Sequence, residues 1–127
     1  MGTRAWIGYQ NEDDTITATY SHWNGDPNGV GVMLDQYYNT LDKAKEVANL
    51  GYISNLHEDI SQTKKEAANQ IEPMIFLNRY SFIRDMNDDI HIEWGYCYTR
   101  KNYWMVYEGK SNKGLLLSKV VSKLKRK

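Results

Sequence analysis

The chain has 127 residues, the usual size of one domain and enough to bury a core without disulfide staples. Its single cysteine, Cys97, excludes an intramolecular disulfide, and no apolar run approaches the roughly 20 residues that cross a bilayer. The net charge is zero, but residues 110–127 carry seven basic residues and no acidic one, against nine basic and sixteen acidic in residues 1–109. We therefore expect a single domain over 1–127, with an acidic body and a basic C-terminal helix or tail over 110–127.

The first residues, MGTRAWIGYQ, lack the charged start and apolar centre of a signal peptide, so we expect a cytoplasmic protein that does not enter a membrane. Residues 3–10 then alternate apolar and polar side chains, and residues 16–22 (ITATYSH) are rich in β-branched and aromatic types. The polar segment NEDDT lies between them. This pattern predicts a β-hairpin.

The stretch HWNGDPNGVG, residues 22–31, ends this hairpin, because its glycines and proline break the extended pattern. A helix is predicted to begin within residues 30–38. Thr40 is predicted to be the N-cap of a further helix over 41–50, whose apolar side would lie on the sheet, and Gly51 would close it.

The middle of the chain is less regular. Residues 57–73 are polar enough to form an exposed helix or a mobile insertion, which Pro73 ends. Residues 74–86 are apolar at mixed spacing, and short runs of this kind are ambiguous between strand and helix. We favour a helix there.

Residues 90–98 and 103–107 flank the polar turn TRKN and predict a second hairpin. Residues 117, 120, 121 and 124 are apolar at helical spacing among lysines, which predicts a short amphipathic C-terminal helix. The fold class that follows is α+β: a small antiparallel sheet built from two hairpins, packed against helices on one face, with a C-terminal amphipathic helix.

The stretch 22–31 is the first candidate site. A strand, a glycine-bearing loop and a helix start can present free backbone N–H groups to an anion. The loop lacks the lysine of a phosphate-binding Walker motif, however, and the carboxylate of Asp26 would repel a phosphate. A structural turn and a ligand loop both stay open. The candidate binding residues are His22, Trp23, Asn24, Asp26 and Asn28.

Metal binding and catalysis have weaker support. The three histidines, His22, His57 and His91, are far apart in sequence, and one cysteine cannot build a thiolate cluster. No base is evident beside Cys97 or a serine. We expect no metal, no cofactor and no catalytic residue, although a carboxylate–histidine pair formed by the fold would leave an enzyme open.

The aromatic content is high, with ten tyrosines and four tryptophans. In the second hairpin, the aromatic side chains could form a core, a contact between two copies of the chain, or a surface that stacks nucleobases. The core is the interpretation we favour. If bases stack there, phosphates would pair with basic residues at the hairpin tip. The candidate residues are Tyr96, Tyr98, Trp104, Arg100 and Lys101.

The N-terminal residues also resemble a family of small proteins encoded by bacteriophages and prophages. Its members have a Met-Gly/Ala-Thr-Arg start, a strand that ends in His-Trp-Asp/Asn-Gly, then a Pro and a Gly-Val-Gly that leads into a helix. The resemblance covers about the first 56 residues, and Asn24 stands where the family more often has aspartate. The matching residues are Thr3, Arg4, His22, Trp23, Asn24, Gly25, Pro27, Gly29, Val30 and Gly31.

The resemblance implies no catalytic residues. It implies a small phage protein made in the bacterial cytoplasm, of a kind that often blocks host defences. Our leading hypothesis is therefore an accessory protein that inhibits a bacterial defence or host process by stoichiometric binding of a protein, in the manner of an anti-CRISPR.

Two alternatives remain, and self-association also stays open. The first is a sponge that sequesters a cyclic nucleotide or another nucleotide signal, whose phosphates would pair with Arg4, Arg100, Lys101 or the tail lysines. The second is nucleic-acid binding through the basic tail.

Overall fold

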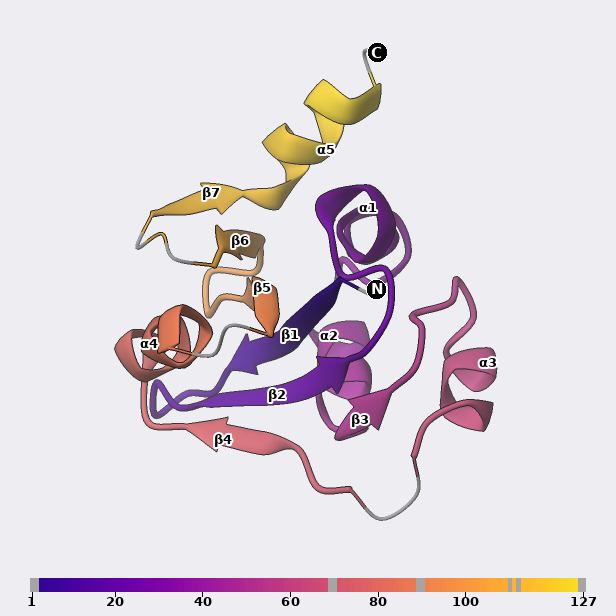
Figure 1. Cartoon of the computed structure of the whole chain (residues 1–127), viewed down its shortest axis with the longest axis horizontal. Helices are drawn as coiled ribbons and strands as arrows, with labels where there is room; N and C mark the ends of the chain where they lie inside the picture. The colour runs from indigo at the N-terminus through magenta and orange to yellow at the C-terminus, as the bar shows by residue number, and fades with distance from the viewer. Residues whose placement is uncertain (1–2, 69–70, 89–90, 110, 112, 126–127) are drawn as a thin grey trace.

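The computed structural model describes residues 3–68, 71–88, 91–109, 111 and 113–125, and a mixed sheet of seven strands forms its centre (Figure 1). The strands follow each other in the order β3-β2-β1-β5-β6-β7, and β4 also pairs with β2. Their bounds are β1 Arg4–Gln10, β2 Ile16–Ser21, β3 Tyr52–Ile53, β4 Met74–Phe76, β5 Ile92–Tyr98, β6 Trp104–Glu108 and β7 Gly114–Leu116.

Both predicted hairpins are present and antiparallel, β1 with β2 and β5 with β6. The two hairpins join through β1 and β5, which run parallel with Ile7 opposite Tyr96. The sheet is therefore mixed, whereas the sequence predicted an antiparallel one. β2 returns the chain to the end of the sheet where β1 begins, and β5 starts at that same end, opposite Arg4, so it runs parallel to β1.

One face of the sheet, here called the three-helix face, is covered by α1 Val32–Tyr37, α2 Leu41–Ala48 and α5 Leu117–Lys125. A single π-helical turn, η1 Pro27–Gly31, leads into α1. The predicted N-cap of α2 is confirmed, because the Thr40 side chain accepts a hydrogen bond from the Lys43 N–H at 3.3 Å. The core on this face includes Ala5, Ile7, Leu34, Val47, Tyr96, Tyr98, Val106, Leu117 and Val121.

The opposite face is covered by α4 Arg79–Asp88 and is here called the α4 face. Phe82 and Met86 are buried there, and a Cβ on Gly95 of β5 would lie 2.1 Å from the Met86 sulfur, so this glycine lets the helix approach the sheet. The prediction of helices on one face is corrected accordingly. The reason is that β2 and β5 carry apolar side chains on both faces, for example Ile16 and Cys97 on the α4 face.

The middle of the chain differs most from the prediction. Residues 74–78 are not helical: β4 pairs antiparallel with residues 16–18 of β2, and α4 begins only at Arg79. The apolar residues of β4 are extended because they pair with β2, and this tertiary pairing outweighs the local sequence pattern. Residues 57–73 contain the short helix α3 Ile60–Lys65. The parts of the predicted segments at residues 69–70, 90, 110, 112 and 126–127 lie outside the described residues.

The α+β class and the C-terminal amphipathic helix are confirmed. Leu117 and Val121 of α5 are buried in the core of the three-helix face, while Lys119 and Lys123 point to solvent. Among the described residues, no helix combines the length and the apolar character that crossing a bilayer requires.

Candidate functional site

The loop between β2 and α1 is held by close backbone contacts with the sheet. The Gly25 N–H donates to the Thr3 carbonyl at 2.8 Å, and the buried Tyr96 hydroxyl donates to the Gly25 carbonyl at 2.7 Å. A Cβ on Gly25 would lie 2.8 Å from the Thr3 oxygen, and one on Gly29 would lie 2.4 Å from the Asn24 oxygen. These glycines are therefore required by close approach within the fold.

The backbone N–H groups that made this loop a candidate anion site already donate hydrogen bonds within the protein. The Gly29 and Gly31 N–H groups donate to the Asp26 carbonyl at 3.0 and 3.3 Å, and the Val30 N–H donates to the Asn24 carbonyl at 2.8 Å. These three amides are not available to an anion. Asn28 is exposed, and the Asp26 side chain caps no amide of η1. The structural-turn interpretation explains the glycines of this loop.

His22 and Trp23 continue the pairing of β2 beyond its last strand residue. The His22 N–H donates to the Ile53 carbonyl at 3.0 Å, and the Trp23 N–H donates to the Ser54 carbonyl at 2.9 Å. The Asn24 amide donates to Asn55 Oδ1 at 2.8 Å. These hydrogen bonds join the end of β2 to β3 and to the two residues that follow it.

An aromatic cluster forms at this edge of the sheet. The His22 and Trp23 rings meet edge-on with centroids 4.8 Å apart, and the Tyr20 hydroxyl lies 3.1 Å from His22 Nδ1. Tyr52 of β3 lies 5.1 Å from the Tyr20 ring. Trp23 keeps 43% of its surface exposed. The structure therefore brings together His22, Trp23 and Asn24, but as part of strand pairing and ring packing.

The basic residues proposed as phosphate partners do not converge. In the parallel register, Arg4 lies opposite Ile92 at the start of β5, whereas Arg100 lies two residues beyond the end of that strand. A seven-residue strand spans roughly 20 Å. The Arg100 guanidinium is also paired with the Asp14 carboxylate at 2.8 Å. Lys101 is exposed beside it at the hairpin tip, so Arg4 and these two residues cannot share one phosphate.

The aromatic residues of the second hairpin that were candidates for binding are buried. Tyr96, Tyr98 and Trp104 are at most 3% exposed, and the Trp104 indole donates to the Tyr38 carbonyl at 3.1 Å. Burial raises the pKa of the Tyr96 phenol well above its ordinary value. These rings present no face to a base or a partner. They form the core, which is the interpretation favoured from the sequence.

Sequence reasoning missed an exposed run of large apolar side chains next to β4, here called the apolar strip. Leu77 is 73% exposed and Tyr80 is 84% exposed, and the whole strip falls within ten consecutive residues. β4 pairs with β2 on one side, and its other side meets no strand among the described residues. The short apolar run after Pro73 was the available signal. The strip consists of Ile71, Met74, Ile75, Leu77 and Tyr80.

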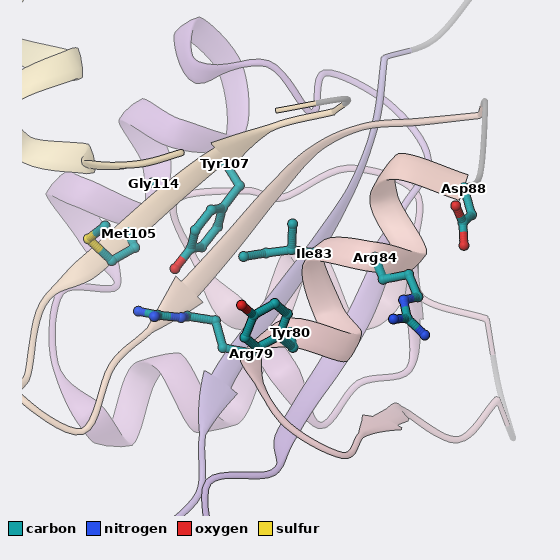
Figure 2. A pocket seen from close by; sticks show the side chains of 8 residues that line it. All are labelled: Arg79, Tyr80, Ile83, Arg84, Asp88, Met105, Tyr107 and Gly114. Atoms are coloured by element: carbon teal, nitrogen blue, oxygen red, sulfur yellow. The ribbon is translucent and has the colours of Figure 1, made fainter. Parts of the chain in front are cut away.

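A cavity of about 580 Å³ lies beside the strip, between α4 and the last two strands (Figure 2). Figure 2 shows the Arg79 side chain directed toward the Tyr107 hydroxyl, with the Tyr80 ring between Arg79 and Arg84 in this view. Burial is the main cause that raises the pKa of Tyr107, so its phenol is protonated at neutral pH. The lining residues are Arg79, Tyr80, Ile83, Arg84, Asp88, Met105, Tyr107 and Gly114.

The described residues show no metal centre: no three side chains of His, Cys, Asp and Glu among them lie in a metal-binding group. Cys97 is buried, and burial raises the pKa of its thiol to about 12, so it is no nucleophile at neutral pH. His57 Nε2 lies 2.9 Å from a Glu66 carboxylate oxygen, and both side chains are partly exposed. The features that stand out are thus an apolar surface and a basic cavity, both suited to binding.

Comparison with profiles of known protein families, with curated proteins and with solved structures finds no match for this chain.

Proposed function

We propose that this protein acts by stoichiometric binding of another protein, with the apolar strip as its contact surface. The observation that carries the proposal is the exposure of five large apolar side chains within ten residues, from Ile71 to Tyr80. Several large apolar side chains exposed along one edge of a small domain are typical of an interaction site, because exposing them to water is otherwise costly. The resemblance of the N-terminal part to phage proteins favours a bacterial host or defence protein as the partner.

The open side of β4 suggests how such a partner binds. An edge strand presents unpaired backbone groups to which an extended segment of another protein can add as a further strand. Ile75, the central residue of β4, is 58% exposed and would contact side chains of the added segment. The partner that fits is one that offers an extended apolar segment, with main-chain hydrogen bonds for affinity and side-chain contacts for specificity.

A photo-crosslinking residue at Leu77 tests the proposal in bacteria that carry phage-defence systems. We expect covalent capture of one bacterial protein, which then binds the purified chain with one-to-one stoichiometry. Ile75→Lys should weaken this complex by roughly tenfold or more, because a charge replaces a central apolar contact. Expression of the wild-type chain should also raise phage plating on that host, and Ile75→Lys should abolish this effect.

The matched control is Leu115→Lys. Leu115 lies on the edge strand β7 and is 50% exposed, but it lies outside the strip. The proposal fails if both variants weaken the complex equally or if neither does. It also fails if the strip captures only a second copy of this chain, which light scattering would show as a dimer that Ile75→Lys dissociates.

A further inference from the structure

The cavity beside α4 combines cationic, hydroxyl, apolar and aromatic side chains around one hollow (Figure 2). Its volume of about 580 Å³ falls within the range of ligand pockets, roughly 300–1,000 Å³. We propose that this cavity binds a nucleotide, with its phosphate held by Arg79 and Tyr107 and its base against Tyr80. The inference does not rest on protein binding through the apolar strip, although Tyr80 belongs both to the strip and to the cavity.

The phosphate end of the site is built by two groups from different elements. Figure 2 shows the Arg79 side chain directed toward the Tyr107 hydroxyl, so the guanidinium and the protonated phenol can both donate hydrogen bonds to the same anion. Arg79 also makes no ion pair with a carboxylate of the described residues. A guanidinium fork without a carboxylate partner suits the geometry of phosphate oxygens.

The other side chains fit a planar base. Tyr80 is 84% exposed at the rim, and the apolar side chains of Ile83 and Met105 form part of the wall. Stacking of a base on an aromatic ring contributes about 1–3 kcal/mol in proteins that bind single-stranded nucleic acids. A free phosphate would contact only Arg79 and Tyr107, and a free nucleoside would contact only the part of the wall near Tyr80.

Charge determines the orientation of the ligand. Asp88, the last residue of α4, lines the cavity far from Arg79 in Figure 2, and its carboxylate repels a phosphate there. The broader hollow of about 1040 Å³ near Arg100 is a poorer phosphate site, because Glu12 and Asp13 also line it. The basic residues that a nucleotide needs are thus found at Arg79 and Arg84, not at the residues that the sequence suggested.

Isothermal titration of the full chain with adenosine 5′-monophosphate, guanosine 5′-monophosphate and cyclic adenosine 3′,5′-monophosphate tests the inference. Adenosine and inorganic phosphate serve as separate probes of the two halves of the ligand. At least one nucleotide should bind at micromolar concentration, with adenosine and phosphate each weaker by about tenfold or more. The inference is overturned if no nucleotide binds, or if phosphate alone binds as tightly as the best nucleotide.

Three variants locate the binding. Arg79→Gln should weaken the best nucleotide by about tenfold or more, since a charged hydrogen bond is lost, and Tyr107→Phe should weaken it by a smaller factor. Arg100→Gln removes an equal charge outside the cavity and should leave affinity unchanged. Circular dichroism confirms that each variant is folded, and should Arg79→Gln fail to fold, Tyr107→Phe with Arg84→Gln makes the same test. Full affinity in the cavity variants, or loss in Arg100→Gln, overturns the assignment.

Discussion

The two faces of the sheet differ in how completely they are packed. On the three-helix face, the buried tyrosine Tyr96 and the buried threonine Thr19 both use their hydroxyl groups, Tyr96 on the Gly25 carbonyl and Thr19 on the Val47 carbonyl at 2.6 Å. On the α4 face, α4 is the one helix of the described residues that covers the sheet, and a cavity remains beside it. The apolar strip follows the β4 edge into α4.

Because of this difference, we expect one region of the molecule to determine stability and another to determine binding. The glycine-rich loop that attracts attention in the sequence belongs to the three-helix face, where its backbone contacts are internal. The exposed apolar side chains belong to the β4 edge and the start of α4, and Arg79 and Arg84 line the cavity beside α4. Substitutions on the three-helix face should therefore change the free energy of unfolding, while substitutions in the strip or cavity should change binding.

The largest expected effect is that of Leu34→Ala on the three-helix face. Leu34 is fully buried, so truncation should lower the free energy of unfolding by about 2–5 kcal/mol through lost burial and a residual cavity. Leu77→Ala, at 73% exposure in the strip, should change it by less than about 0.5 kcal/mol. Urea denaturation followed by tryptophan fluorescence measures both. Equal losses would show that the strip is a structural element.

The sequence correctly predicted those elements in which the periodicity of apolar residues matches the burial of their side chains. Residues 4–10 alternate, and Ala5 and Ile7 are buried as the alternation predicts. β4 was missed because three residues are too few to show a period, and because its state depends on pairing with residues 16–18, distant in sequence. The parallel pairing of β1 with β5 likewise depends on the tertiary fold, and no local sequence pattern predicts it.

The second expected effect is that of Tyr96→Phe. The phenol donates to the Gly25 carbonyl in a buried position, and its removal leaves that carbonyl unsatisfied, at a cost of about 1–3 kcal/mol. Tyr103→Phe, on a ring that is 37% exposed, is the control and should be nearly neutral. Thermal denaturation of both variants makes the comparison. A neutral Tyr96→Phe would mean that the loop after β2 is not held through this hydroxyl.

Alkaline pH should produce a smaller effect that depends on Cys97. Burial raises the pKa of its thiol from 9.0 to about 12 in the folded chain, so above pH 9 the unfolded chain binds fewer protons than the folded one. The stabilisation is therefore complete below pH 9 and is lost as the pH rises toward 12. The expected loss from this group is about 1.4 kcal/mol per pH unit within that window.

Cys97→Ala separates this contribution from that of the tyrosines. The variant should show a shallower fall in the free energy of unfolding between pH 9 and about 10.5 than the wild type, whatever its stability at neutral pH. Urea titrations at several pH values measure the slope. Identical slopes would show that the thiol ionises equally in the folded and unfolded chains.

The candidate binding groups were harder to predict than the fold, for two physical reasons. Which apolar side chains of residues 71–80 point outward depends on β4 and on the point where α4 begins. The cavity joins Arg79 and Tyr107, which are 28 residues apart and belong to a helix and a strand. By contrast, His22 and Trp23 stand out because they are adjacent in the chain, yet strand pairing already accounts for their backbone positions.

The smallest effects on stability should come from Trp23→Ala and Tyr80→Ala, and their effects on binding should differ. Trp23 is 43% exposed and loses its edge contact with His22, which corresponds to about 0.5–1.5 kcal/mol. Tyr80 is 84% exposed, so its removal should change stability by less than about 0.5 kcal/mol. Tyr80→Ala should weaken both the captured protein and the nucleotide, whereas Trp23→Ala should leave both affinities at the wild-type value. The opposite result would place the binding surface at the loop after β2, because both rings are exposed and only their location distinguishes them.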